Sequence, residues 1–453
     1  MKVSQWKLSS IGKHIFYIFA AAMTKNSIVA LSLVVGLLGA LTSCDDSFDA
    51  MSGSYSSELS TSERSEAEET RRVLILYMPA YNNLSDEIRG NLEDLEEGYL
   101  PGTSRSDDVV LAFSKFPAKD GDYNTASNAT LVRFYDDGDG PVRDTLVVYD
   151  DSVNLSDAGV MYDVLSYICE EFPAAGYGLL FSSHSTGWVP GDYYSYPSKY
   201  SSLSLNSIET GEDDPYADLV KSFGADYNGS SSNASFIELE ELAAALPMHF
   251  DYIIFDACLD GGVEIAYELK DACDYMVGCP TEVLSQGFIY KTIVEHLFGG
   301  EEPDLQAVCE DYYDYYAAQS GTLQSATVSL VDCAYMDELA SVCAGLFSVY
   351  GEALRSGSYD EDDIQAYFRT SSKHWYYDLR DMLSVVGATE DELAQLDDVL
   401  DRVVIYKAAT EYFIGLEIEN YSGLSMYLPC DGSTYLDTYY QSLAWNAATG
   451  LVE

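Results

Sequence analysis

The strongest constraint on the fold is a repeated alternation of short, uninterrupted apolar runs with amphipathic segments. Each run has the length and composition of a strand that is buried on both faces of a sheet. The runs are residues 73–78, 108–116, 177–183, 251–257 and 274–279. Helical periodicity marks residues 84–100, 237–246 and 261–272, and also residues 156–172, a helix that we expect to begin at Ser156. Because strands that alternate with helices form a mostly parallel sheet covered on both faces, the sequence predicts a three-layer α/β/α fold.

Two regions break this rhythm. Residues 190–235 are rich in Ser, Tyr and Gly, so we expect a long polar insertion that stays outside the core. Further along, a helix, a strand at residues 327–332 and a long helix are followed by residues 412–429, which are predicted to form a β-hairpin or a strand pair. We therefore expect a core at residues 71–332, completed by a C-terminal helical and β extension at residues 333–453.

The balance of charge excludes one large class of partner. The chain of 453 residues has 23 Lys and Arg against 75 Asp and Glu, which gives a formal net charge of −52. Such a chain repels a phosphate backbone, and no local basic patch is visible, so we expect no nucleic-acid partner. The carboxylates fit a solvated surface, attraction of cationic substrates, or calcium binding, although no EF-hand spacing is present.

The N-terminal segment has the layout of a secretory signal. A basic stretch leads into the apolar residues 27–40, which are short for a membrane span and end at small residues and a cysteine. The sequence LTSC that ends at Cys44 resembles a bacterial lipobox, in which the cysteine is lipidated and becomes the first residue of the mature protein. A transmembrane anchor is the alternative, because residues 15–22 add apolar length. Both Met1 and Met23 are candidate starts of the reading frame.

Residues 45–70 have the composition of a flexible tether, since they are rich in Ser and Glu and contain few large apolar groups. Acidic residues directly after a lipidated cysteine resemble the surface-export signals of Bacteroidetes lipoproteins. The predicted location is the bacterial outer membrane or cell surface, with membrane contact only through the lipid on Cys44. A periplasmic or secreted protein is the alternative.

Polar side chains follow two of the predicted strands, at points where neighbouring parallel strands would bring them together. His184 comes directly after residues 177–183, and Cys258 directly after residues 251–257. Because loops converge at the carboxyl ends of parallel strands, we expect the two side chains to lie near each other. A thiolate that attacks a carbonyl needs such an imidazole, and backbone N–H groups that hold the developing oxyanion. Each residue by itself is more often structural, and their joint placement makes a catalytic role about as probable as a structural one.

Other histidines compete less well for the role of base. His249 precedes the strand that delivers Cys258, so it should lie at the opposite edge of the sheet, and His296 falls inside an amphipathic helix. His374, beside Trp375, is the main rival.

Four segments resemble motifs of the clostripain-like cysteine peptidases, which are relatives of caspases, legumains and gingipains. SSHSTGW at residues 182–188 resembles the family's Asp-His-Gly-x-Gly-Trp element, and residues 255–277 resemble its Asp-Ala-Cys-Leu-Met-Gly element with the helix that follows. YMPAYNNL at residues 77–84 and SGLSMYLP at residues 422–429 resemble a first-strand and a late motif. The likeness spans about residues 71–430. It implies a caspase-like α/β/α sandwich and a cysteine endopeptidase that acts on peptides or proteins, and the N-terminal segment predicts that this enzyme is exported.

The resemblance also implies roles for single residues. His184 falls on the general base and Cys258 on the nucleophile that forms a thioester acyl-enzyme, with the backbone N–H groups of Ser185 and Cys258 holding the oxyanion. Asp256 falls on an acidic residue of the specificity pocket, where a carboxylate can pair with a substrate Arg or Lys. The alternative for Asp256 is a strand-end residue that bonds to the loop backbone. Gln286 falls on a second substrate-binding position.

The chain departs from the family pattern at four of these positions. Ser185 replaces a glycine, Asp260 replaces a methionine, and Tyr81 replaces an aspartate. Gln286 stands where relatives often have an Asp, so a second carboxylate for a basic side chain is lost. We therefore expect cleavage after basic residues, but no strict preference for Arg or Lys.

Two further properties follow from the family alone. Members often mature by cutting themselves between the His and Cys motifs, and the insertion with Lys199 and Lys221 is where we would expect such a cut. Calcium dependence occurs among relatives, so calcium enters only by analogy, and no cofactor or metal site is otherwise implied.

Two non-enzymatic functions remain as alternatives. The altered site residues are compatible with a non-catalytic surface lipoprotein that uses the caspase-like fold to bind a protein or ligand. A sugar-binding lipoprotein would use the 38 Tyr and 4 Trp, but core packing explains those aromatic residues better.

The nine cysteines are not spaced for zinc or a redox couple, because no CxxC pair is present. Apart from the lipidation site and the nucleophile, seven remain, an odd number that cannot all pair within one molecule. We expect most of these seven to be buried thiols. They are Cys169, Cys273, Cys279, Cys309, Cys333, Cys343 and Cys430.

Overall fold

The computed structural model describes residues 71–104, 106–191, 223–227, 234–368 and 375–453. All of them belong to one compact unit, Ser60–Glu453. The predicted export signal, the lipidation site Cys44 and the tether lie outside the described residues, as do Lys199, Lys221 and His374. Within the described ranges, no helix is long and apolar enough to cross a membrane.

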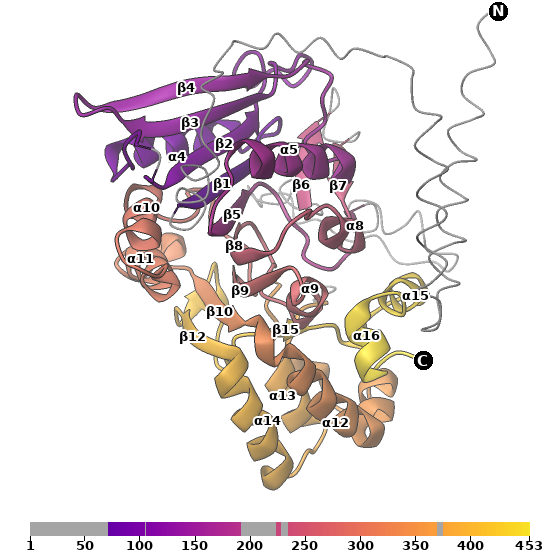
Figure 1. Ribbon diagram of the computed structural model, residues 1–453. Coiled ribbons are helices and arrows are strands. Elements are labelled where there is room, and N and C mark those ends of the chain that lie inside the picture. Colours follow the sequence, from indigo (N-terminus) through magenta and orange to yellow (C-terminus); the bar gives the residue numbers. More distant parts are fainter. Residues whose placement is uncertain (1–70, 105, 192–222, 228–233, 369–374) are drawn as a thin grey trace, which may run out of the picture. The chain divides into compact units, whose positions relative to one another are not determined.

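A nine-stranded sheet forms the centre of this unit (Figure 1). In spatial order its strands are β12 (Val404–Ala409), β10 (Thr327–Asp332), β9 (Cys273–Gly278), β8 (Phe250–Asp256), β5 (Gly176–Ser182), β1 (Arg72–Pro79), β2 (Val109–Lys115), β3 (Thr130–Asp136) and β4 (Pro141–Val148). The strands from β9 to β2 are parallel, and antiparallel strands extend both edges. The predicted parallel sheet is thus confirmed in the middle, where the site lies.

Helices cover both faces of the sheet, which confirms the three-layer α/β/α architecture (Figure 1). One face carries α5 (Ala158–Glu171), α8 (Leu239–Ala244) and α9 (Val263–Leu269), and the other carries α4 (Ser85–Glu97), α10 (Tyr290–Phe298) and α11 (Leu305–Ala317). Strand β1 shows why the run is uninterruptedly apolar: Val73 and Ile75 join one hydrophobic cluster, whereas Leu74 and Leu76 join the other.

The C-terminal region adds helices α12 (Met336–Ser356), α13 (Leu379–Val385), α14 (Glu390–Val403), α15 (Thr434–Tyr440) and α16 (Ala444–Thr449). Short 3₁₀ turns occur at Gly321–Leu323, Cys333–Tyr335, Glu361–Asp363 and Pro429–Asp431. The predicted hairpin in residues 412–429 is confirmed in its first half, where β13 (Tyr412–Phe413) pairs with β14 (Leu416–Glu417). The second half, β15 (Ser425–Met426), pairs instead with β11 (Tyr377–Asp378).

The prediction that the whole of residues 190–235 stays outside the core was wrong. Strand β6 (Phe223–Tyr227) is buried along its length and pairs with β7 (Ala234–Ile237). The ring of Phe223 lies 6.2 Å from that of Phe181 and 5.6 Å from that of Phe255. The segment was misjudged because it is short and its flanking residues are polar, so its apolar side chains were diluted in the composition of the insertion.

Two local details also differ from the sequence prediction. Helix α5 begins at Ala158, two residues later than expected, because the carboxylate of Asp157, and not Ser156, accepts hydrogen bonds from the N–H groups of Gly159 and Val160. The hairpin β3–β4 was not predicted, since β4 is mostly exposed and has no apolar run to mark it.

The cysteines and aromatic residues behave as the composition predicted. Every cysteine in the described ranges is a free thiol, and Cys273, Cys279, Cys309, Cys333 and Cys343 are buried. The largest fully buried side chains are mostly tyrosines. Core packing therefore accounts for many of the aromatic residues.

Candidate active site

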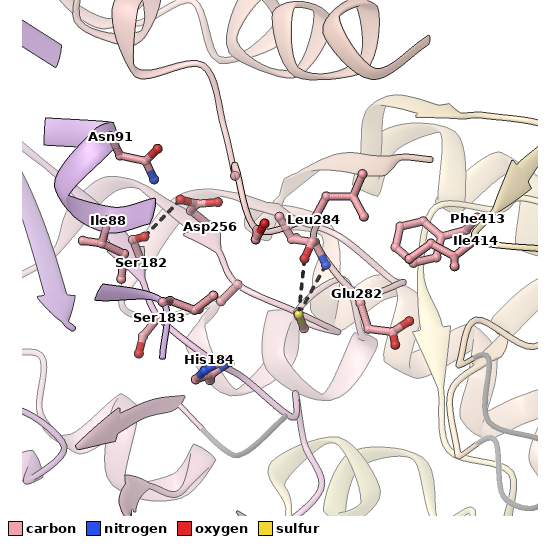
Figure 2. A pocket seen from close by; sticks show the side chains of 16 residues that line it. Ile88, Asn91, Ser182, Ser183, His184, Asp256, Glu282, Leu284, Phe413 and Ile414 are labelled. Atoms are coloured by element: carbon pink, nitrogen blue, oxygen red, sulfur yellow. Dashed lines mark hydrogen bonds between the residues drawn. The ribbon is translucent and has the colours of Figure 1, made fainter. Parts of the chain in front are cut away.

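The two sequence-predicted catalytic residues leave adjacent strands at the same edge of the sheet. Strands β5 and β8 are parallel neighbours, with Ser182 opposite Asp256 in the register. His184 and Cys258 follow these positions and line one pocket (Figure 2). The volume of this pocket is about 50 Å³. The expected convergence of the two loops is therefore present.

His184 is held by a neighbour that sequence reasoning did not single out. The side chain is only 2% exposed, and its Nε2 lies 2.7 Å from Oδ1 of Asn83. The hydroxyl of Tyr227 donates to the same oxygen at 2.8 Å. Because an amide oxygen can only accept hydrogen bonds, this contact requires a proton on Nε2 of His184, and in the neutral form of the ring Nδ1 is then the basic nitrogen.

Asn83 and Tyr227 were missed for different reasons. Asn83 lies inside one of the motifs that resembled the peptidase family, but a motif match gives no contact partner. Tyr227 lies in β6, in the part of the insertion that was expected to stay outside the core. No pattern in the sequence links either residue to His184.

The Cys258 thiol contacts the backbone of the neighbouring loop. The N–H of Val283 donates to Sγ at 3.3 Å, and Sγ lies 3.8 Å from the carbonyl oxygen of the same residue (Figure 2). Burial raises the pKa of this thiol, the charge of Glu282 raises it further, and the Val283 N–H acts in the opposite direction. The neutral thiol is thus favoured in this conformation.

Asp256 lies in the wall of the pocket and already accepts three hydrogen bonds. Its Oδ2 accepts hydrogen bonds from Ser182 Oγ at 3.0 Å and Tyr290 Oη at 2.7 Å, and its Oδ1 accepts from the Phe288 N–H at 3.2 Å. Burial raises the pKa of this carboxyl, while the three donors lower it. Asp256 therefore lines the pocket and also bonds to the loop backbone.

Gly287 shows how closely this loop approaches Asp256. Its φ is +65°, and a Cβ atom there would lie 2.4 Å from Oδ1 of Asp256. Only glycine combines this backbone conformation with this distance.

The pocket also has apolar walls and a second carboxylate. Apolar walls come from three parts of the chain, with Leu84 and Ile88 on one side, Leu284 on another, and Phe413 and Ile414 on a third. The buried carboxylate of Glu282, which sequence reasoning missed, lines the same space. Asn91, Ser182, Ser183 and Ser285 are further polar lining residues, and no Lys or Arg among the described residues lines the pocket.

Two sequence-predicted site residues do not line this pocket. Gln286 is exposed, although its neighbours Ser285 and Gly287 are lining residues. Ser185 is fully buried.

The two other histidines that the structure describes, His249 and His296, do not line the pocket. His249 is exposed beside Asp274 at the opposite edge of the sheet, with its Nε2 3.0 Å from that carboxylate. His296 lies in α10 and pairs with Asp311 at 2.7 Å. In the part of the chain that the structure describes, no group of three or more His, Cys, Asp or Glu side chains could hold a metal ion.

Comparison with known proteins points in one direction. The sequence model described as Peptidase C11, clostripain family, matches residues 76–202 and 213–450. A C11 protease of Parabacteroides distasonis, described as an inactive zymogen, has 27% identity and a TM-score of 0.66 over 84% of this chain and 98% of its own. A secreted C11 cysteine protease of Bacteroides thetaiotaomicron in complex with an irreversible peptide inhibitor has 23% identity and a TM-score of 0.65 over 84% and 99%. No curated protein matches the chain.

Proposed function

The chain belongs to the clostripain family and is a cysteine peptidase, and from this premise we propose that it cleaves peptide bonds through an acyl-enzyme on Cys258, with His184 as general base. The observation that carries the proposal is that both side chains line one pocket at the carboxyl ends of adjacent parallel strands. An imidazole and a thiol in one pocket are the groups that acyl transfer to sulfur needs.

In the proposed reaction, Nδ1 of His184 takes the proton of the Cys258 thiol. The thiolate then forms a bond to the peptide carbonyl carbon. When the tetrahedral intermediate collapses, the C–N bond breaks and His184 gives its proton to the leaving amine. A water molecule that His184 deprotonates attacks the thioester and releases the carboxylic acid and the free thiol.

Asn83 supports this assignment of roles. With Nε2 of His184 donating to Oδ1 of Asn83, the lone pair that must take the proton is on Nδ1. Asn83 does not line the pocket, so we assign it a positioning role.

The oxyanion would be held by the backbone N–H groups of Cys258 and Ser185. Ser185 is fully buried and the thiol is favoured in its neutral form, so the described conformation fits a resting state. The loop around Val283, which the thiol contacts, would have to shift when substrate binds. The similarity to a protease described as an inactive zymogen supports this interpretation.

For the substrate, we propose a peptide whose side chain before the scissile bond enters the pocket. A long cationic side chain would place its aliphatic stem against Leu84, Ile88 and Leu284 and its charge near Asp256 and Glu282. Because Asp256 already accepts three hydrogen bonds, Glu282 is the better candidate for the charge contact. Gln286 would contact the peptide only at the rim.

We also propose export with a lipid anchor on Cys44, so that the catalytic unit faces the outside of the outer membrane. The support is the resemblance to a lipobox and the structural likeness to a protease described as secreted. Metabolic labelling with a lipid analogue should mark the wild type and not Cys44→Ser.

The test is hydrolysis of a mixed fluorogenic peptide library by protein that begins after residue 44. We expect activity in the wild type, loss of at least about 100-fold in Cys258→Ala and in His184→Ala, and unchanged unfolding temperatures. Equal activity in either variant would reject the assigned dyad.

One observation favours a second function, the binding lipoprotein. Burial raises the pKa of the Cys258 thiol, so the thiol stays protonated. A protonated thiol is a poor nucleophile, as in an unreactive buried cysteine. A wild type that cuts no member of the library, even with calcium added and the insertion nicked by trypsin, would make binding the better account.

A further inference from the structure

Two of the departures from the family pattern touch each other in the structure. Oγ of Ser185 donates a hydrogen bond to Oδ1 of Asp260 at 2.6 Å, and both side chains are fully buried. The glycine and methionine that the family motifs carry at these positions have no groups that could form this bond. The two replacements are therefore complementary.

The bond joins the two loops that carry the proposed catalytic residues. Ser185 directly follows His184, and Asp260 comes two residues after Cys258. The same loops meet again through their backbones, since a Cβ atom at Gly187 would lie 2.4 Å from the carbonyl oxygen of Leu259. There is consequently little room for one loop to slide past the other.

Where the two loops meet, both backbones adopt the left-handed conformation, which few residues other than glycine adopt. Gly187 has a φ of +56°, and Leu259, which has a side chain, has a φ of +65°. A non-glycine residue in this region costs on the order of 1 kcal/mol or more and persists when its surroundings enforce it. The Ser185–Asp260 bond is one of the contacts that can supply this enforcement.

The hydroxyl of Ser185 has a defined direction. It accepts a hydrogen bond from the Gly187 N–H at 3.0 Å, so its proton is directed to Asp260. Burial raises the pKa of Asp260 well above its usual range, which favours the neutral carboxyl. Its Oδ2 is buried and has no hydrogen-bond partner among the residues that the structure describes, as expected if no full charge resides there.

We propose that the Ser185–Asp260 hydrogen bond is a latch that holds the His184 loop against the Cys258 loop and thereby sets the position of the base relative to the nucleophile. The inference rests on the proposed function, because it concerns how the same dyad is assembled. Neither residue lines the pocket, so both are positioning residues.

The test is a double-mutant cycle built from the residues of the family motif. Ser185→Gly and Asp260→Met each remove one partner, and the double variant restores the family pair. We expect each single variant to lower kcat about 10- to 100-fold with KM changed less than about threefold, because a small displacement of reacting groups is costly. The double variant should recover to within about fivefold of the wild type, since partners in contact are not additive.

A second readout separates positioning from general damage. Alkylation of Cys258 by iodoacetamide, followed by mass spectrometry over a range of pH, reports how well His184 assists the thiol. At low pH, part of the alkylation rate of the wild type depends on His184 and is lost in His184→Ala. The single variants should lose this same part of the alkylation rate. Asp260→Asn keeps an acceptor of the same size, so it should retain at least about half of the wild-type kcat.

Three outcomes decide the inference. Single variants with wild-type kcat, or a double variant whose loss is the product of the two single losses, would overturn the latch and leave the proposed function standing. Alkylation profiles that match the wild type in all variants would also overturn it. An inactive wild type with no His184-dependent alkylation would remove the proposed function, and the latch with it.

Discussion

At the scale of residues, the environment of His184 is more informative than its position in a motif. Nε2 of His184 and Oη of Tyr227 converge on a single oxygen of Asn83. This arrangement fixes which ring nitrogen can act as base, which is the kind of orientation that a third residue supplies in other nucleophile–histidine pairs. Substitutions at Asn83 should therefore change catalysis without changing the pocket.

We expect Asn83→Ala to lower kcat about 10- to 100-fold with little change in KM, because the ring loses its orienting acceptor. Asn83→Asp keeps the acceptor and adds a negative charge beside Nε2, which favours the imidazolium form and raises the pKa of His184. The acid limb of the kcat/KM profile should therefore move to higher pH. Tyr227→Phe, which keeps the ring, is the matched control for packing. A profile that does not move in Asn83→Asp would contradict the assigned tautomer.

Residue types and strand ends were enough to predict His184, Cys258 and the convergence of their loops. They were not enough for the groups that hold them, because Asn83, Tyr227 and Glu282 come from segments far away in the sequence. Asp260 is a clear example, since the sequence identified it only as a departure from a motif. Its meaning comes from the contact with Ser185, which follows from the register of β5 against β8.

At the scale of elements, helix α9 is tied to the C-terminal region by one buried carboxyl. Oε1 of Glu264 accepts hydrogen bonds from the Tyr427 N–H at 2.9 Å and the Tyr440 hydroxyl at 2.7 Å. Burial raises the pKa of Glu264 to about 7, with the two donors acting in the opposite direction. The folded protein thus holds this proton more tightly than the unfolded chain, whose pKa is near 4.5.

The sign of the pH effect follows from this difference. The contribution of Glu264 to stability is fully present below about pH 4.5 and is lost as the pH rises through 7. Over this range it amounts to roughly 3 kcal/mol at most. Glu264→Gln stays neutral at every pH. We therefore expect the denaturant concentration at its unfolding midpoint to depend less on pH between pH 5 and 8 than that of the wild type. Identical pH dependence in the two proteins would contradict the assignment.

Strands with a continuous apolar run were predictable from the sequence, and strands without such a run were not. Strands β1, β5 and β8 were recognised because both of their faces are buried. Strand β4 is largely exposed, and β6 is a short buried strand inside a polar segment, so neither has the expected pattern. Strand β6 also contacts the site, since the Gly224 N–H donates to the His184 carbonyl oxygen at 3.0 Å.

At the scale of the whole molecule, the C-terminal region completes the central sheet. Strand β12 pairs with β10 and covers an edge that would otherwise be open, and Trp445 of α16 packs on Tyr267 of α9 at 5.6 Å between ring centroids. The sequence predicted a C-terminal extension at residues 333–453 but could not predict that its strand joins the sheet. Pairing between distant strands depends on the topology and not on a local pattern.

A chain of residues 71–332 should therefore fail to fold by itself. It would expose the β10 edge and the apolar surface under α12 and α16. We expect residues 71–453 to unfold cooperatively in denaturant and residues 71–332 to show no cooperative transition. A cooperative transition with peptidase activity in the shorter chain would instead establish it as an independent catalytic domain.

The central claim is that Cys258 is the nucleophile and that His184 activates it. The most direct measurement is labelling of the protein by a peptide with a thiol-reactive carbonyl group, with the modified residue located by mass spectrometry. The account predicts one label per molecule, on Cys258, and labelling at least about tenfold slower in His184→Ala. A label on another cysteine, or an equal rate in His184→Ala, would contradict it.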